Sequence, residues 1–335
     1  MNDSALLCQS FDAIGFDLDG VIYRGPLPVP GAPETLGELS RFGVPVSYVT
    51  NNAARPPQVV ADQLASFGVA CSAADVVTSA QATARLMASE LPSGAEVLVV
   101  GSAALSDEIA AVGLKPTDHR GPQTSAVVVG FDPAMTWEQM NQGCYAVQQG
   151  AAYYACNSDM TRPTDGGLAI GMGGVLMAMG LVLNIAPVMG GKPARPLLDE
   201  TRRRLHAEHP LFVGDRLDTD IEGAMVAGWA SLFVLSGGHG PADLVAALPQ
   251  CRPDFLASDI RGLLQPARVA SFDGNGWHCG LIVASVGQAG AVIAGPLDSD
   301  EQRLDGLWAL ANLAWQRADQ GAPIDVASAM ESLTR

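Results

Sequence analysis

Polar residues that could do chemistry follow four apolar runs of the chain, where β-strands are expected to end. Open parallel sheets hold their ligands beyond the carboxyl ends of the strands, so these positions are the first candidates for a site. Carboxylate oxygens suit Mg²⁺, and a lysine can neutralise an anion. Each group alone is also typical of an ordinary turn. The candidates are Asp17 and Asp19; Thr50, Asn51 and Asn52; Gly191 and Lys192; and Gly214, Asp215 and Asp220.

An alternation of short apolar runs with helical patterns positions these residues. It predicts strands at "AIGFD", "VPVSYVTNN", "ADVVTSA", "APVMGGKP", "PLFVGDRLDTD" and "ASLFVLSGG", and helices over residues 33–42, 56–67, 196–206 and 221–228. Strands that alternate with helices indicate a parallel sheet covered by helices on both faces. We therefore expect an α/β core whose two halves are separated in the sequence.

Two further portions of the chain differ from this core in their pattern of apolar runs and turns. The runs "AEVLVVG", "SAVVVGFD" and "AAYYACN" predict three more strands, each followed by a helix, in a separate inserted α/β unit. After Gly262 we expect a hairpin turned at "DGNG", a strand at "AGAVIAG" and a helix with a capping box at Ser299 and Gln302. The predicted division is 1–80 and 186–262 for the core, 81–185 for the insertion, and 263–335 for a small α+β extension.

The charge balance argues against nucleic acid and anionic membranes as partners. The 335 residues carry 19 Lys plus Arg against 35 Asp plus Glu, a formal charge of −16, and such a surface repels polyanions. The only short basic run, "RRRL" at Arg202–Leu205, is typical of the solvated face of a helix. We therefore expect no nucleic-acid partner.

Cysteine usage and hydropathy indicate a reduced, cytoplasmic protein. The six cysteines are scattered, without a CxxC pair and without a secretion signal ahead of them. The apolar stretch 168–191 is long enough to imitate a membrane span, but six glycines, Asn184 and Pro187 interrupt it. We expect a buried helix leading into a core strand there, and no membrane span.

Taken together and in this order, the four groups resemble the motifs of the haloacid dehalogenase superfamily. The segments "DLDGVIYRG", "VTNNAARP", "GKP" and "VGDRLDTDIEGAMVAG" are similar to its NagD or p-nitrophenylphosphatase-like branch. The likeness spans roughly residues 11–262 and implies a Rossmann-like core with an inserted C2-type α/β cap. The whole chain, tail included, resembles the actinobacterial glycerol 3-phosphate phosphatases of this branch. Four motifs in register are a far more specific signal than one DxD.

The resemblance implies a role for each aspartate. Asp17 would be the nucleophile that becomes aspartyl-phosphate, and Asp17 and Asp215 would bind Mg²⁺ through their carboxylates. Asp19 would bind the ion through its backbone carbonyl, while its side chain protonates the leaving alkoxide and then activates water. Asp220 would hold metal-bound water. The acid at position 19 favours a phosphatase over a dehalogenase, because a halide leaving group needs no proton; the cap favours a hydrolase over a mutase.

The remaining motif residues would bind the substrate. Thr50 and the Asn51 amide at one strand end would contact phosphoryl oxygens, with Asn52 beside them as a further substrate-binding candidate, and the bare Gly20 N–H would approach the phosphate. Lys192 would neutralise both the nucleophile and the transferring group.

The cap is expected to select the leaving group. Its segment "ACNSDMTRPTDGGLAIGMGG" resembles the branch pattern that faces the active site, with Asn157, Asp159 and Arg162 as candidate substrate contacts and Gly171 and Gly173 shaping the turn. The pattern is broken at Ile170, where proline is usual. A plain turn explains Arg162 equally well.

By resemblance, the expected reaction is hydrolysis of a small phosphate ester, first of all glycerol 3-phosphate. Phosphoglycolate, pyridoxal phosphate and nucleotide monophosphates are alternatives within the branch. A different alternative is a regulated or scaffolding protein whose C-terminal module dominates. The expected partners are the substrate and a second copy of the chain, bound through the cap or the C-terminal module.

Overall fold

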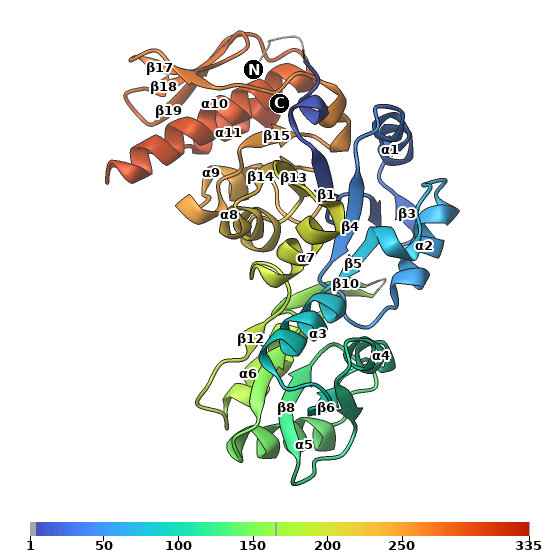
Figure 1. Ribbon diagram of the computed structural model, residues 1–335. Coiled ribbons are helices and arrows are strands. Elements are labelled where there is room, and N and C mark those ends of the chain that lie inside the picture. Colours follow the sequence, from blue (N-terminus) through green and yellow to red (C-terminus); the bar gives the residue numbers. More distant parts are fainter. Residues whose placement is uncertain (1–4, 165, 335) are drawn as a thin grey trace. The chain divides into compact units, whose positions relative to one another are not determined.

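The computed structural model describes residues 5–164 and 166–334 (Figure 1). The chain falls into two compact units. Unit 1 contains the segment up to Arg24, Pro28–Pro45, and the chain from His209 onward. Unit 2 contains Gly25–Leu27 and Val46–Glu208. The division of the chain into core, cap and extension at residues 80, 185 and 262 stays a prediction from the sequence.

Parallel strands form the centre of unit 1. They pair in the order β15-β14-β13-β1. Every residue of β1 and β13 is buried, as expected for parallel strands covered on both faces. The strands are β1 (Ala13–Phe16), β13 (Pro210–Gly214), β14 (Ala230–Val234) and β15 (Phe255–Ala257). After β1, the short β2 (Tyr23–Arg24) and β3 (Leu27–Pro28) pair with each other in a separate sheet. The helices are α1 (Ala32–Arg41), α8 (Glu222–Ala227) and α9 (Pro241–Val245), with single turns η1 (Leu7–Ser10), η3 (Leu217–Ile221), η4 (Pro249–Cys251) and η5 (Ile260–Leu264).

The C-terminal part of unit 1 is an antiparallel sheet covered by a long helix (Figure 1). The sheet order is β16-β17-β18-β19. The predicted hairpin and strand are confirmed, and so is the capping box, in which the Gln302 N–H donates to Ser299 Oγ at 3.2 Å. The elements are β16 (Ser271–Phe272), β17 (Gly276–Cys279), β18 (Ile282–Val286), β19 (Ala291–Ala294), α10 (Asp300–Asp319) and α11 (Ala327–Thr334).

Helix α10 also packs on the parallel part of unit 1. The Trp315 side chain is 7% exposed and shares one hydrophobic cluster with Phe233 of β14 and Leu244 of α9. Its Nε1–H donates to the Leu244 carbonyl at 3.0 Å, and its ring meets Trp308 edge-on. The Arg252 guanidinium donates two hydrogen bonds to the Asp319 carboxylate. The extension is therefore built into the core of unit 1.

Unit 2 is organised around a five-stranded parallel sheet in the order β12-β9-β8-β6-β7, that is, Val188–Met189, Ala152–Ala155, Thr124–Val129, Glu96–Val100 and Lys115–Thr117. Along β6, Val97 and Val99 face α3 (Ser79–Glu90) and α4 (Ala103–Ala111), whereas Leu98 and Val100 face α5 (Trp137–Gln148) and α6 (Met172–Gly180). This alternation buries both faces of the sheet. The same unit holds β4 (Val46–Thr50) paired in parallel with β5 (Val76–Thr78).

The other elements of unit 2 follow the predicted alternation in part: helices follow β6 and β8, but β7 leads directly to β8, and β9 is followed by the antiparallel pair β10–β11 instead of a helix. Its helices and turns are α2 (Pro57–Ser66), η2 (Ala73–Asp75), α3 (Ser79–Glu90), α4 (Ala103–Ala111), α5 (Trp137–Gln148), α6 (Met172–Gly180) and α7 (Pro196–Leu205). Its other strands are β6 (Glu96–Val100), β7 (Lys115–Thr117), β8 (Thr124–Val129), β9 (Ala152–Ala155), β10 (Thr161–Thr164), β11 (Gly167–Ile170) and β12 (Val188–Met189).

The apolar stretch 168–191 differs from its predicted structure. A helix does lead into a strand there, α6 into β12, but the helix is short, it follows the strand β11, and the stretch is only partly buried: Met172 and Met179 are buried, whereas Leu168, Ile170 and Leu181 are at least 73% exposed. Its glycines and Pro187 interrupt the run, because both residue types disfavour a long helix. Among the described residues, no helix is long and apolar enough to cross a membrane. The strand "APVMGGKP" was expected in the core sheet, but β12 pairs with β9 in the five-stranded sheet.

The basic run of α7 is also more than a solvated face. Arg204 is 23% exposed, and its guanidinium donates to the Val76 carbonyl of β5 at 3.0 Å and to the Gln81 side chain of α3. Burial opposes ionisation of Glu200, but hydrogen bonds from Arg203 and Arg204 prevail and lower the pKa of its carboxyl. These contacts fix α7 against β5 and α3.

The packing of Trp315 makes a stability prediction. Trp315→Ala should lower the free energy of unfolding by about 3–5 kcal/mol, because it empties a buried ring site in the α10 interface. Urea unfolding followed by circular dichroism measures this loss. Trp137→Ala is the control, since Trp137 is 71% exposed and its truncation should stay within about 0.5 kcal/mol. Equal effects of the two variants would contradict the anchoring role.

Candidate functional site

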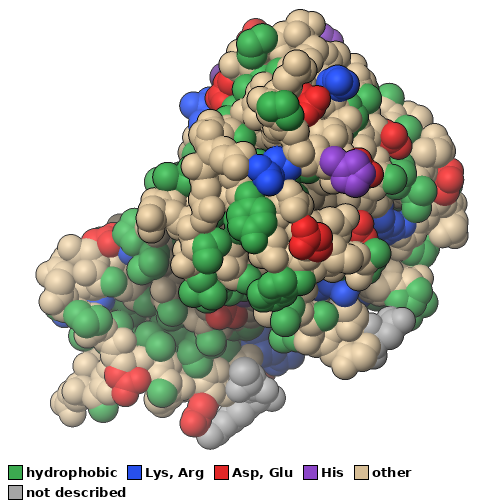
Figure 2. Space-filling view, turned by 90° about the horizontal axis from the view of Figure 1, so that it is seen from below, with side chains coloured by type: hydrophobic (Ala, Val, Ile, Leu, Met, Phe, Trp, Pro, Cys, Tyr) green, Lys and Arg blue, Asp and Glu red, His purple; other side chains and the backbone are tan. Residues whose placement is uncertain are grey.

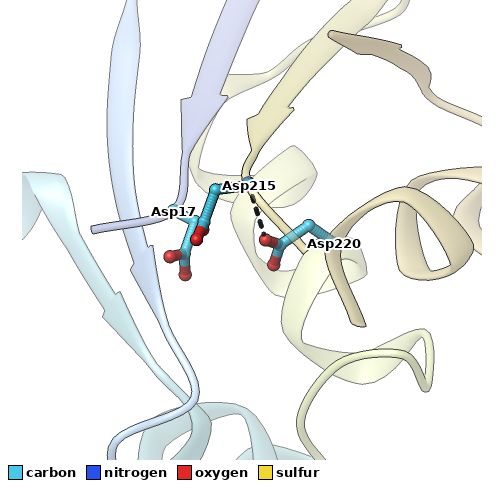
Figure 3. A group of neighbouring side chains, drawn as sticks. All are labelled: Asp17, Asp215 and Asp220. Carbon is cyan, nitrogen blue, oxygen red and sulfur yellow. Dashed lines mark hydrogen bonds between the residues drawn. The ribbon is translucent and has the colours of Figure 1, made fainter. Parts of the chain in front are cut away.

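Three carboxylates of unit 1 lie together (Figure 3). Asp17 follows β1, Asp215 follows β13, and Asp220 lies in η3. Each offers one oxygen, and these oxygens lie within 4.8 Å of one another. Asp215 and Asp220 are 2% and 1% exposed, and Asp17 is half-buried. Adjacent parallel strands β1 and β13 bring Asp17 and Asp215 to the same sheet edge.

Backbone N–H groups orient two of these carboxylates. Asp220 Oδ2 accepts from the Asp215 N–H at 3.2 Å and from the Arg216 N–H at 3.0 Å (Figure 3). Asp215 Oδ2 accepts from the Gly238 N–H at 2.5 Å. Hydrogen bonds to an ionised carboxylate favour its charged form and fix its direction.

Glycines make room for this arrangement. A Cβ at Gly20, where φ is +90°, would stand 2.3 Å from Asp215 Oδ2. A Cβ at Gly237 would stand 1.9 Å from the same oxygen, and one at Gly214 would stand 2.2 Å from Asp220 Cβ. The Gly20 N–H, predicted to approach the phosphate, donates to the Tyr23 carbonyl at 2.7 Å. The structure therefore requires that residue 20 have no side chain.

The loop after β14 belongs to the site and was missed in the sequence. Ser236 Oγ donates to the Gly20 carbonyl at 2.7 Å, and Gly238 holds Asp215. His239 Nδ1 accepts from the Leu217 N–H at 2.9 Å and so fixes the start of η3. The signal was present in "ASLFVLSGGHG", because a strand followed by Ser-Gly-Gly-His is one more polar strand end.

The carboxylate group fits a hard divalent cation. Its donors are all oxygens, two of them belong to buried residues, and Mg²⁺ prefers such ligands while it keeps some water. The Asp19 side chain is exposed and lies outside this group. Asp17 and Asp215 would hold the ion, and its charge would offset their mutual repulsion.

The second set of predicted residues gathers in unit 2 around Asn51. Its side chain is hydrogen-bonded to the backbone of Lys192, which is 1% exposed, and to the Asp159 carboxylate. Thr50 Oγ1 accepts from the Asn52 N–H at 3.1 Å. Asn52 is exposed, and its Oδ1 accepts a hydrogen bond from the Ala54 N–H. The Thr50 and Asn52 side chains therefore both stabilise a local turn.

The predicted cap residues divide into two kinds. Asn157 is 4% exposed, donates to the Asn51 carbonyl at 2.7 Å and accepts from the Asp159 N–H. The Arg162 guanidinium is exposed and lies 4.6 Å from the centre of the Phe131 ring. A Cβ at Gly171 would stand 2.1 Å from the Asp159 carbonyl oxygen, which explains glycine there. Direct contact of these residues with a substrate stays a prediction.

Cys156 lies beside this group but is not a nucleophile. Complete burial raises the pKa of its thiol to about 12, although a hydrogen bond with Thr83 opposes the shift. The thiol is therefore protonated at neutral pH, and the thiolate is the nucleophilic form.

Comparison with known proteins identifies the family. The profile of the haloacid dehalogenase-like hydrolases matches residues 14–115, and a HAD-hydrolase-like profile matches residues 189–263. A D-glycerol 3-phosphate phosphatase of Mycobacterium tuberculosis is 37% identical over 314 residues, which cover 92% of this chain and 87% of the relative. The chain belongs to the haloacid dehalogenase-like hydrolases.

Solved structures of this hydrolase family agree with that assignment. The crystal structure of a glycerol phosphate phosphatase from M. tuberculosis in complex with magnesium has a TM-score of 0.84 at 36% identity, covering 93% of this chain and 92% of that one. A p-nitrophenyl phosphatase from Archaeoglobus fulgidus has a TM-score of 0.70 at 26% identity, covering 76% and 98%. The predicted α/β hydrolase fold and the resemblance to this branch are confirmed.

The close approach at Gly20 makes a testable prediction. Gly20→Ala should raise the dissociation constant for Mg²⁺ by about tenfold or more, because its Cβ displaces the Asp215 carboxylate. Isothermal titration calorimetry measures the affinity. Gly25→Ala is the matched control: its φ is also positive, at +56°, but nothing lies within 4 Å of the added Cβ. Similar affinities in the two variants would refute the steric role of Gly20.

Proposed function

We propose that the protein is a Mg²⁺-dependent phosphatase of small phosphate monoesters, with glycerol 3-phosphate as its substrate. The observation that carries this proposal is the group of three carboxylates at the strand ends of unit 1. Support for the substrate comes from the D-glycerol 3-phosphate phosphatase that is 37% identical over 314 residues, which cover 92% of this chain. That match includes the C-terminal extension, because it reaches well beyond the core and cap.

The first step joins two negative groups. Asp17 attacks phosphorus as the nucleophile, the phosphorus–oxygen bond to the alcohol breaks, and the electron pair leaves with the alkoxide. Asp17 and Asp215 would hold the cation, whose positive charge would lower the repulsion between nucleophile and phosphate. Asp19 donates a proton to the alkoxide. The exposed Asp19 side chain suits a group that exchanges protons with substrate and water.

The second step releases phosphate. Asp19, now a carboxylate, accepts a proton from water as that water attacks the aspartyl-phosphate. The acyl–phosphate bond breaks, which regenerates Asp17 as a carboxylate and Asp19 as an acid. Asp220 contributes by fixing the turn at Asp215 and Arg216 through its hydrogen bonds.

We assign the phosphoryl-binding roles to Thr50, Asn51 and Lys192 from the motif pattern. The Lys192 ammonium would neutralise the transferring group, and the Thr50 hydroxyl and the Asn51 N–H would donate to its oxygens. Asn52, Asn157, Asp159 and Arg162 remain proposed substrate residues. The Asn52 and Asn157 side chains form hydrogen bonds with backbone groups of the protein, which indicates that they also shape the site.

A substrate panel tests the proposal. With Mg²⁺, glycerol 3-phosphate should show the highest kcat/KM among glycerol 3-phosphate, phosphoglycolate, pyridoxal phosphate and nucleotide monophosphates, and EDTA should abolish turnover. Asp17→Asn is the control for contaminating phosphatases, and it should lower kcat by about 10³-fold or more, as loss of a covalent nucleophile does.

The outcomes of this panel are distinct. No turnover of any ester with Mg²⁺ overturns the phosphatase. A nucleotide preference overturns only the glycerol specificity, and the 34% identity to a 5'-nucleotidase of Bacillus subtilis over 66% of this chain makes nucleotides the sharpest competitor.

We also propose that the protein forms a homodimer through the cap or the C-terminal module. In unit 2, the exposed apolar side chains of β11, α6 and the segment before β12 support the cap: Leu168, Ile170, Met177, Leu181 and Ile185. The face shown in Figure 2 carries many hydrophobic side chains among scattered charged ones. Large exposed apolar patches are typical of interfaces. Sedimentation equilibrium should give twice the chain mass, whereas a monomer would rule the dimer out.

We propose the cytoplasm as the site of action. The support is that all six cysteines are free thiols, as in a reducing compartment. Cell fractionation tests this location, and recovery of the protein outside the cytoplasmic fraction would contradict it.

A further inference from the structure

The Asn51 side chain connects three segments of unit 2 that are distant in sequence. Its Oδ1 accepts from the Lys192 N–H at 2.8 Å, and its Nδ2 donates to the Lys192 carbonyl at 3.1 Å and to Asp159 Oδ1 at 3.1 Å. Asn51 follows β4, Asp159 follows β9 and Lys192 follows β12. Both hydrogens of the amide nitrogen are thus used within the protein.

We propose that Asn51 is a positioning residue that fixes Lys192 and couples it to the cap segment 157–159, and that its side chain does not contact the substrate. This inference rests on the proposed phosphatase function, because it concerns the lysine assigned to the phosphoryl group. It also gives Asn51 a task other than the phosphoryl contact expected from its motif.

The chemistry of the side chain matches this task. One carboxamide pairs with both the N–H and the carbonyl of Lys192, as a neighbouring strand would. A serine is too short to make both bonds, and an aspartate has no donor. The pairing matters here because β12 is only two residues long, Val188–Met189, and no strand continues through Lys192.

Close packing makes the pairing rigid. A Cβ at Gly191 would stand 2.6 Å from Asn51 Oδ1 and 2.3 Å from the Cys156 carbonyl oxygen, so the loop before Lys192 lies directly against both groups. Asn51 is 9% exposed and Lys192 is 1% exposed. A buried residue in such a close contact has little freedom to re-form its hydrogen bonds elsewhere.

The bond to Asp159 extends the network to the cap segment. Asn157 donates to the Asn51 carbonyl at 2.7 Å and the Asn51 amide donates to Asp159 Oδ1 at 3.1 Å, so residues 157–159 are held to Asn51 at two points. Within the segment, the Asp159 N–H donates to Asn157 Oδ1 at 3.2 Å. The Asn51–Asp159 bond joins a donor to a carboxylate, and such bonds are stronger than neutral ones. Movement of Lys192 and of this segment is therefore linked through one side chain.

The position makes a prediction that a contact with the leaving group does not, and the exchange of residues 51 and 159 described below separates it from a direct phosphoryl contact. Every phosphate ester presents the same phosphoryl group to Lys192, so loss of the Asn51 side chain should lower kcat by one common factor for all esters. A residue that touched the leaving group would instead change the ranking of the esters.

The first experiment is Asn51→Ala with the full substrate panel. We expect kcat to fall by about 10²-fold for every ester turned over, the size reported for a small misplacement of a catalytic group. Thr201→Ala is the control for lost stability, since the buried Thr201 hydroxyl donates to the Leu197 carbonyl at 2.8 Å in the same unit. It should lower the melting temperature but leave kcat within about threefold, as a change remote from the reacting groups does.

The second experiment exchanges donor and acceptor. Asn51→Asp keeps the acceptor for the Lys192 N–H but places a second carboxylate beside Asp159, so activity should fall sharply. The double variant N51D/D159N restores a hydrogen bond between positions 51 and 159 in the opposite direction. It should recover kcat by about fivefold or more over N51D, as expected for two residues in contact.

Each outcome has one meaning. Kinetics of Asn51→Ala within threefold of wild type, or a loss that differs from ester to ester, overturns the positioning role. A double variant no better than N51D overturns the coupling to Asp159. If wild-type protein hydrolyses no ester, the proposed function fails first and takes this inference with it; if wild type is active, the two fail separately.

Discussion

The site depends on holding like charges close together. The carboxylate oxygens of Asp17, Asp215 and Asp220 lie within 4.8 Å of one another, and two of these residues are almost fully buried. Buried ionised groups without compensation destabilise a fold by several kcal/mol each. Fixed N–H groups of Asp215, Arg216 and Gly238 provide part of the compensation. A divalent cation bound among the three carboxylates would supply the rest of this compensation.

This crowding explains the glycines around the carboxylates. Asp215 is approached so closely by the loops at Gly20 and Gly237 that any side chain there would overlap it. The short turn η3 returns Asp220 to the N–H groups at the end of β13, and Gly214 leaves space for its Cβ. Rigid preorganisation of this kind means that the charges need little rearrangement when the substrate arrives.

Unit 2 positions a buried basic side chain, that of Lys192. Lys192 has to be held by its backbone, because a flexible side chain alone would not fix its ammonium. A single carboxamide, that of Asn51, supplies both backbone hydrogen bonds. By binding Asp159 as well, the same group makes the cap segment part of the support for the lysine.

The extension after residue 263 is held by packing as well as by charge. Trp308 and Trp315 of α10 join the cluster of Phe233 and Leu244, so the antiparallel sheet and the parallel strands of unit 1 share one core.

Sequence patterns predicted the hairpin, the capping box and the helix, because these depend on neighbours along the chain. What the sequence by itself determined was the α/β alternation and the strand ends that carry Asp17, Thr50, Lys192 and Asp215, since hydrophobic period and motif spacing are local properties. The tertiary structure alone decided that β12 pairs with β9, that Leu168, Ile170 and Leu181 in the 168–191 stretch are exposed, and that Gly238 and His239 support the carboxylates. It also chose the partners of Asn51, which lie 108 and 141 residues away along the chain; a side-chain amide finds its partners by proximity in space, and that proximity exists only once the strands have paired.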